Sequence, residues 1–150
     1  MTHLEALAKA EQYQSKMAKI AKKSYWKPQY HISAPANWIN DPNGFCYFNG
    51  EYHVFYQYHP YSSQWGPMHW GHVASKDLVN WSKVGEITPE KHATYEKNGL
   101  CAPGALVRDG KVHLFYQTYG NGKNDAICHA VSTDGIHFDR DPSNPIFHPT

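Results

Sequence analysis

The sequence predicts an all-β fold that is built from a repeated unit and preceded by a single α-helix. From residue 45 onward, short runs rich in aromatic and β-branched residues alternate with turn signals, as expected of strands. The turns are Asn-Gly or Asp-Gly pairs at residues 49–50, 109–110 and 134–135, each of the type found in tight hairpins. Residues 1–23 lack this pattern and are rich in alanine and lysine, which indicates a helix.

The repeat emerges when the first two of these turns are superposed. Residues 48–57 then align with residues 108–117, and both copies contain the pattern Gly-x-x-His-x-Phe-Tyr-Gln. Further along, residues 72–77 align with residues 129–134 through the pattern His-x-x-Ser-x-Asp. Two copies of a hairpin followed by two more strands favour successive four-stranded blades of a β-propeller. A two-sheet sandwich stays open, because the number of strands does not determine how the sheets close.

Residues 1–23 predict one amphipathic helical extension ahead of the β-rich part, residues 24–150. Its apolar residues recur at helical spacing, at Leu4, Leu7, Met17 and Ile20. Glutamates interrupt its lysines, so a solvated face explains them better than a patch for nucleic acid or membranes. We therefore expect this helix to pack against the β-rich part.

Composition excludes several classes of protein. The 150 residues carry a net charge of only +1, and no apolar run approaches a membrane span, so neither a nucleic-acid nor a membrane partner is expected. The N-terminus lacks the pattern of a secretion signal, which favours a cytoplasmic location. The three cysteines, Cys46, Cys101 and Cys128, are too widely spaced for a zinc pattern and predict free, buried thiols. Only His69 and His72 lie close together among the histidines, so neither a metal nor another cofactor is expected.

The strongest candidate for chemistry is Asp41, within Trp-Ile-Asn-Asp-Pro-Asn-Gly at residues 38–44. Pro42 restricts the backbone, and Asn43-Gly44 suits positive φ angles, so the segment predicts a tight turn just before a strand. A carboxylate held rigidly in this way suits nucleophilic attack on a sugar carbon. The aromatic, amide and imidazole groups of residues 52–60 and 64–72 suit the apolar faces and polar edges of sugar rings.

The chain resembles the N-terminal part of glycoside hydrolase family 32, the β-fructofuranosidase group that includes invertases and sucrose-6-phosphate hydrolases. The resemblance runs from about Tyr30 to the C-terminus and rests on four segments in family order: residues 38–44, 55–58, 70–81 and 109–116. It implies a five-bladed β-propeller, of which this chain would hold about two blades. It also implies that Asp41 is the catalytic nucleophile of a retaining mechanism.

Four further positions are implied to bind substrate. Asn40 and Gln57 resemble the family's hydroxyl-binding amides, Trp65 resembles an aromatic wall of the sugar pocket, and Trp38 leads the Asp41 segment. Each could instead be a packed blade residue. His53 and His113 occupy equivalent positions of the repeat, which indicates a structural role.

The second catalytic group is missing from these residues. The resemblance implies an acid/base glutamate in a Glu-Cys pair, but the residue directly before each of the three cysteines is not a glutamate. It also implies an aspartate in an Arg-Asp-Pro triplet that follows an Asn-Pro strand. Residues 140–142 spell this triplet but precede Asn144-Pro145, so we interpret them as an ordinary turn and expect the true triplet beyond Thr150.

These observations predict a glycosidase acting on sucrose, sucrose 6-phosphate or fructans. Two blades cannot close a ring, so we expect the chain to be part of a longer protein or to need a partner, and to be inactive alone. A non-catalytic carbohydrate-binding or assembly module, completed by oligomerisation, is the alternative. A related five-bladed hydrolase of arabinose- or xylose-containing glycans is a third. Ala102-Pro103-Gly104-Ala105 replaces the family's Ser-Gly-Ser-Ala, and the loss of two hydroxyls makes sucrose specificity less certain than fructosyl hydrolysis.

Overall fold

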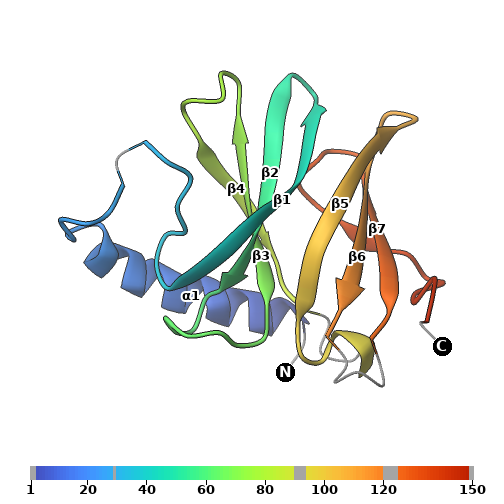
Figure 1. Ribbon diagram of the computed structural model, residues 1–150, viewed down its shortest axis with the longest axis horizontal. Coiled ribbons are helices and arrows are strands. Elements are labelled where there is room, and N and C mark those ends of the chain that lie inside the picture. The colour runs from blue at the N-terminus through green and yellow to red at the C-terminus, as the bar shows by residue number, and fades with distance from the viewer. Residues whose placement is uncertain (1–2, 29, 90–93, 120–124, 149–150) are drawn as a thin grey trace.

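The chain forms one α-helix and two four-stranded sheets in the computed structural model, which describes residues 3–28, 30–89, 94–119 and 125–148 (Figure 1). The helix α1 spans His3–Ala21. The first sheet consists of β1 (Trp38–Phe48), β2 (Glu51–His59), β3 (His69–Ser75) and β4 (Ser82–Ile87). The second consists of β5 (Leu100–Arg108), β6 (Lys111–Thr118), β7 (Ile127–Ser132) and β8 (Asp139–Arg140). The predictions of an all-β fold and of an N-terminal helix are confirmed.

Both sheets are antiparallel meanders with their strands in chain order. At the first hairpin, Asn49 and Gly50 have φ angles of 50° and 83°, and at the equivalent hairpin Asp109 and Gly110 have 51° and 69°. Positive φ at both central residues is what a tight hairpin turn requires. The second and third strands also share their register, since Phe55 pairs with His72 as Phe115 pairs with His129. The sequence repeat therefore corresponds to one structural unit used twice.

The third predicted hairpin turn, Asp134-Gly135, is wrong in its detail. It belongs to a longer loop between β7 and β8, in which the Asp134 carboxylate accepts hydrogen bonds from the backbone of Ile136 and His137, each at 2.8 Å. Asp77 does the same after β3. Hydrogen bonds from Asn80 hold the pKa of the Asp77 carboxyl group well below the usual range, and hydrogen bonds from the side chain and backbone of His137 do the same for Asp134. Since each side chain satisfies the backbone that follows it, the loop widens instead of closing as a two-residue turn.

The two sheets pack face to face around one apolar cluster. Phe55 and Trp70 of the first sheet meet Leu114 and Tyr116 of the second, and all four are at most 2% exposed. The first strands of the two sheets, β1 and β5, are in contact, and no strand crosses from one sheet to the other. This arrangement fits successive propeller blades.

A buried ion pair stabilises the segment that links β4 to β5. Glu96, from the short 3₁₀ helix Thr94–Glu96, is fully buried and lies 3.3 Å from a guanidinium nitrogen of Arg140 in β8. The Tyr116 hydroxyl donates to the Glu96 carboxylate at 2.7 Å, and Arg140 donates to the carbonyl of Thr88 at 2.8 Å. The link is therefore tied to the second sheet by a charged network.

Helix α1 packs beneath the first sheet (Figure 1). Ala10 is buried, and the amide of Gln14 donates to the Tyr58 hydroxyl at 2.9 Å. Ile20, placed on the predicted apolar face, is 60% exposed, so the sheet does not cover this end of the helix. The side chains of Leu4 and Leu7 lie outside the described residues. None of the described helical segments is long and apolar enough to cross a membrane.

A histidine pair occurs at the same place in each sheet. Nδ1 of His53 lies 2.9 Å from Nε2 of His72, and the equivalent atoms of His113 and His129 are 3.0 Å apart. The second pair has a carboxylate partner, since Asp141 lies 2.9 Å from Nδ1 of His129. By contrast, Nδ1 of His72 is buried and has no hydrogen-bond partner among the described residues. The interpretation of these histidines as structural is consistent with this packing.

We expect the free energy of unfolding to decrease as the pH falls from 6.5 toward 3. Burial, and then the charge of His53, lower the pKa of His72 from 6.5 to about 3. Between these values the unfolded chain binds a proton at His72 that the folded chain does not, so stability falls by up to about 1.4 kcal/mol per pH unit. Urea unfolding at several pH values between 4.5 and 7 measures this slope above the range where carboxylates titrate. A His72→Gln variant should flatten the slope and His129→Gln should retain it; equal slopes in all three proteins would contradict the prediction.

Candidate functional site

Asp41 is held in an irregular strand and not in the predicted tight turn. The pairing of β1 with β2 shifts register between Ile39 and Pro42 and again between Asn43 and Cys46. Pro42 cannot donate to the ladder, and Gly44 has a φ of 58°, whereas Asn43 keeps a negative φ. The chain therefore bulges twice without reversing. The exposed Asp41 lies within the first bulge.

The second sheet contains the same irregularity. In β5, the pairing with β6 shifts between Leu100 and Pro103, so residues 101–102 lie in a bulge just as residues 40–41 do in β1. A proline follows both bulges. Cys101 and Ala102 are therefore the structural counterparts of Asn40 and Asp41.

Side chains from both sheets meet beside Asp41. The amide nitrogen of Gln57 donates to Sγ of Cys101 at 3.9 Å, and the thiol of Cys101 donates to the hydroxyl of Tyr119 at 3.5 Å. The ring of Tyr119 lies edge-on to that of Trp65, with centroids 5.9 Å apart. We call these residues, with Asp41, the seam cluster, because they lie between the two sheets.

The register of β1 and β2 sets the bulge that contains Asp41 opposite Gln57, since Ile39 pairs with Tyr58 and Pro42 pairs with Tyr56. Contact with Cys101, followed by burial and the negative charge of Asp41, raises the pKa of Tyr119 to about 12, while a hydrogen bond from Gln57 opposes this shift. Tyr119 is therefore a neutral phenol at physiological pH, with a proton to donate. The cluster thus combines a carboxylate, an amide, a phenol and an exposed indole, groups that can bind sugar hydroxyls and a sugar face.

The sequence predicted three members of the seam cluster and missed two. Asp41, Gln57 and Trp65 lie in it, whereas Cys101 and Tyr119 come from the second sheet. The internal repeat was the signal that could have identified Cys101. Aligning the prolines that follow the two bulges superposes Asn40-Asp41 on Cys101-Ala102.

Two predicted substrate-binding residues have other surroundings. Asn40 lines a cavity on the opposite face of the first sheet, and Trp38 is half-buried with its backbone nitrogen bonded to the carbonyl of Ser62. The structure brings neither side chain into the seam cluster. Residues 40–41 lie in the bulge, where the regular alternation of side chains along the strand is interrupted.

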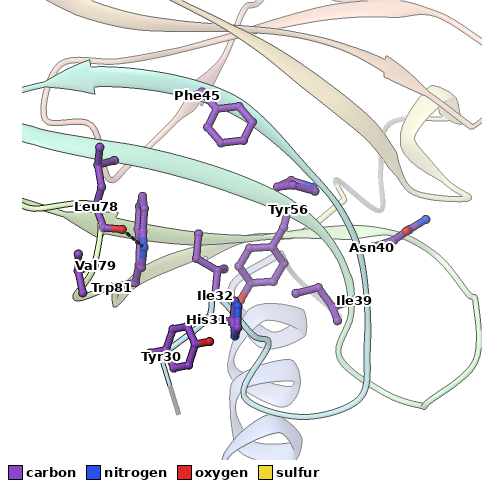
Figure 2. A pocket seen from close by; sticks show the side chains of 11 residues that line it. Tyr30, His31, Ile32, Ile39, Asn40, Phe45, Tyr56, Leu78, Val79 and Trp81 are labelled. Atoms are coloured by element: carbon purple, nitrogen blue, oxygen red, sulfur yellow. Dashed lines mark hydrogen bonds between the residues drawn. The ribbon is translucent and has the colours of Figure 1, made fainter. Parts of the chain in front are cut away.

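That cavity, of about 500 Å³, is largely apolar (Figure 2). Its lining comes from the segment before β1, from β1 and β2, and from the loop after β3, and comprises Tyr30, His31, Ile32, Ile39, Asn40, Pro42, Phe45, Tyr56, Leu78, Val79 and Trp81. None of these described lining residues is acidic. Tyr56, which lines the cavity, belongs to a different apolar cluster from Phe55, which faces the second sheet. The cavity therefore lies on the other face of the first sheet, which is only partly covered.

The Arg-Asp-Pro triplet begins with Arg140, the last residue of β8, and continues into the turn that follows. The Asp141 carboxylate accepts hydrogen bonds from the backbone and the hydroxyl of Ser143, at 2.9 Å and 2.6 Å, and lies beside His129. Arg140 is engaged by Glu96. These contacts agree with the interpretation of the triplet as a structural turn.

Comparison with known proteins decides the family. Residues 31–150 match the model described as the glycosyl hydrolases family 32 N-terminal domain. The chain belongs to glycoside hydrolase family 32. The resemblance found in the sequence is thereby confirmed. This family 32 chain is 40% identical over 142 residues to a sucrose-6-phosphate hydrolase of Zymomonas mobilis, covering 90% of the chain and 28% of the relative. It is 42% identical over 121 residues to a sucrose-6-phosphate hydrolase of Escherichia coli, covering 75% and 25%.

Solved family 32 structures share the fold. The Bombyx mori GH32 beta-fructofuranosidase BmSUC1 superposes with a TM-score of 0.83 at 34% identity, over 99% of this chain and 32% of that one. The sucrose-6-phosphate hydrolase of Lactobacillus gasseri gives 0.82 at 29% identity, over 93% and 29%. These neighbours are propellers, which favours the propeller over the sandwich. The chain spans less than a third of the length of these relatives.

Proposed function

We propose that this chain contributes the nucleophile and one side of the sugar site of a retaining β-fructofuranosidase-type glycosidase. The observation that carries the proposal is the seam cluster, in which the bulge that contains Asp41 lies opposite Gln57, and Gln57 is linked through Cys101 and Tyr119 to Trp65. The relatives support a fructose-containing substrate. A mutant of the Bombyx mori enzyme was solved with sucrose, and a variant of fructan 1-exohydrolase IIa from Cichorium intybus with 1-kestose. Sucrose, sucrose 6-phosphate and fructans are therefore the candidate substrates.

Each member of the cluster has a role in this reaction. The exposed Asp41 attacks the anomeric carbon and forms a covalent glycosyl intermediate, which water then hydrolyses. Gln57 exchanges hydrogen bonds with ring hydroxyls, and Trp65, 58% exposed, offers an aromatic face to the sugar. A second carboxyl group, about 5 Å from the first, must protonate the leaving oxygen. Since the family's Glu-Cys pair is absent from these 150 residues, we propose that additional sequence supplies it.

The outer faces of both sheets support the proposal that further blades pack against them. Each presents apolar side chains that are 40% exposed or more, namely Phe45, Leu78 and Val79 on the first sheet and Leu106, Phe115 and Phe147 beside the second. Apolar surface of this kind packs against another layer in a finished domain. The seam cluster would then form part of a larger pocket. The cytoplasmic location and the division of the chain at residue 23 stay predictions.

The test assays the complete gene product that contains these residues. We expect it to release fructose from at least one of sucrose, sucrose 6-phosphate and a short fructan. Asp41→Asn, which keeps the shape and removes the nucleophile, should lower kcat by at least about a thousandfold. Asp109→Asn changes a carboxylate that is 84% exposed in the hairpin of the other sheet and should leave kcat unchanged.

Other outcomes separate the alternatives. Sugar binding without hydrolysis would favour the non-catalytic carbohydrate-binding module, for which the missing Glu-Cys pair is the supporting observation. Hydrolysis that survives Asp41→Asn would overturn the assignment of the nucleophile. Turnover by residues 1–150 alone, measured in parallel, would contradict the proposal that the acid lies elsewhere.

A further inference from the structure

We propose that the hydroxyl of Tyr119 binds a ring hydroxyl of the fructofuranosyl unit at Asp41, and that Cys101 and Gln57 hold that hydroxyl in place. The proposal rests on the proposed function and deepens it, because it makes the second sheet part of the sugar site. The ligand is a polyol ring that offers oxygen atoms as hydrogen-bond acceptors.

The position of Tyr119 is determined from several sides. Its backbone nitrogen donates to the carbonyl of Gly99 at 3.1 Å, and its ring contacts Trp65 edge-on. Its hydroxyl is engaged by the thiol of Cys101 at 3.5 Å. A side chain held at backbone, ring and hydroxyl loses little entropy when a ligand binds.

The hydrogen-bond directions leave the phenolic proton available. Cys101 donates to the Tyr119 oxygen. With this donor directed at the oxygen, the hydroxyl hydrogen is left to be given to an acceptor outside the pair. A sugar oxygen beside Asp41 is such an acceptor.

The second sheet offers no other side-chain donor along the adjoining stretch of β5. Ala102, Pro103 and Gly104, which follow Cys101, have side chains that cannot form hydrogen bonds. The thiol of Cys101 is itself a weak donor. Tyr119 therefore provides a strong polar contact from this side of the seam.

The test compares Tyr119→Phe with the unmodified protein in the complete gene product. The probe is 2,5-anhydro-D-mannitol, a fructofuranose analogue without a glycosidic bond, so its binding is measured independently of catalysis. We expect Tyr119→Phe to raise the Kd of the analogue about tenfold and to raise KM for the hydrolysed substrate similarly, with kcat changed less. The phenyl ring keeps its contact with Trp65, so folding should be preserved.

Two further variants sharpen the test. Cys101→Ala should raise the Kd in the same direction but less, and Cys101→Ser should restore it, since serine again donates to the phenol. Tyr52→Phe changes a tyrosine that is 37% exposed and packs against Tyr47, and it should have no effect.

The possible failures are distinguishable. If the unmodified protein binds the analogue and Tyr119→Phe binds it equally well, the inference is overturned and the role of Asp41 stands. If the unmodified protein binds the analogue without hydrolysing any fructoside, and Tyr119→Phe weakens that binding, the inference stands and the catalytic proposal fails. If the unmodified protein does not bind the analogue, the inference is overturned, and the hydrolysis assay with Asp41→Asn decides the catalytic proposal separately.

Discussion

A Gly99→Ala variant is expected to lose about 4 kcal/mol or more of its free energy of unfolding. Gly99 has a φ of 118°, which L residues rarely adopt, and an added Cβ would lie 2.2 Å from the backbone nitrogen of Met68. That atom cannot move aside as a side chain would, because Leu100 donates to the Met68 carbonyl at 3.0 Å where the two sheets join. Urea unfolding followed by tryptophan fluorescence measures the loss.

The matched control is Gly110→Ala. Gly110 also has a positive φ, 69°, but an added Cβ there would meet no atom within 4 Å. Its cost is the backbone strain alone, about 1–2 kcal/mol. If the two alanine variants lost equal stability, the steric contact with Met68 would not be the cause.

Replacing Glu96 by glutamine is expected to cost about 3–5 kcal/mol. The substitution preserves shape but removes a fully buried negative charge, and leaves the Arg140 guanidinium, whose side chain is 16% exposed, without this counter-charge. The hydrogen bond from Tyr116 is weakened at the same time, since it no longer ends on an ionised group. Denaturant unfolding near pH 7 measures the effect.

A double-mutant cycle checks this explanation. Arg140→Met alone should also destabilise, but the double variant Glu96→Gln, Arg140→Met should lose less than the sum of the single losses, because no charge is then left buried. Strict additivity would contradict the prediction. Asp109→Asn, in a surface ion pair with Arg108, should change stability by less than about 0.5 kcal/mol.

Local patterns predicted the repeated unit well because they depend on short-range chemistry. The hairpins at Asn49-Gly50 and Asp109-Gly110 are set by residues that tolerate positive φ, and the matching runs after them form matching strands. The helix was predicted by its composition and spacing, but the exposure of Ile20 was not. Helical periodicity identifies an apolar face without showing how much of it a sheet covers.

The site was predicted in part, since its residues come from two sheets. Asp41, Gln57 and Trp65 belong to recognisable segments, whereas Tyr119 follows β6 without any motif and joins them only through the packing of β5 against β1. Asn40 lines the cavity on the other face of the first sheet, and its predicted role in binding substrate stays a prediction. The Asp41 segment itself was expected to reverse the chain, yet Pro42 and Gly44 produce bulges within a continuous strand.

The paired bulges in β1 and β5 bear on how this scaffold tolerates change. Residues 101–102, like residues 40–41, fall where the ladder pairing is interrupted, so exchanging their side chains disturbs little of the sheet's hydrogen bonding. One copy carries an amide and a carboxylate, the other a thiol and a methyl group, on similar backbones. Substitutions at these positions can therefore change ligand preference without disrupting the sheet. In a regular strand, where every residue takes part in the ladder, the same substitutions would disturb more of the pairing.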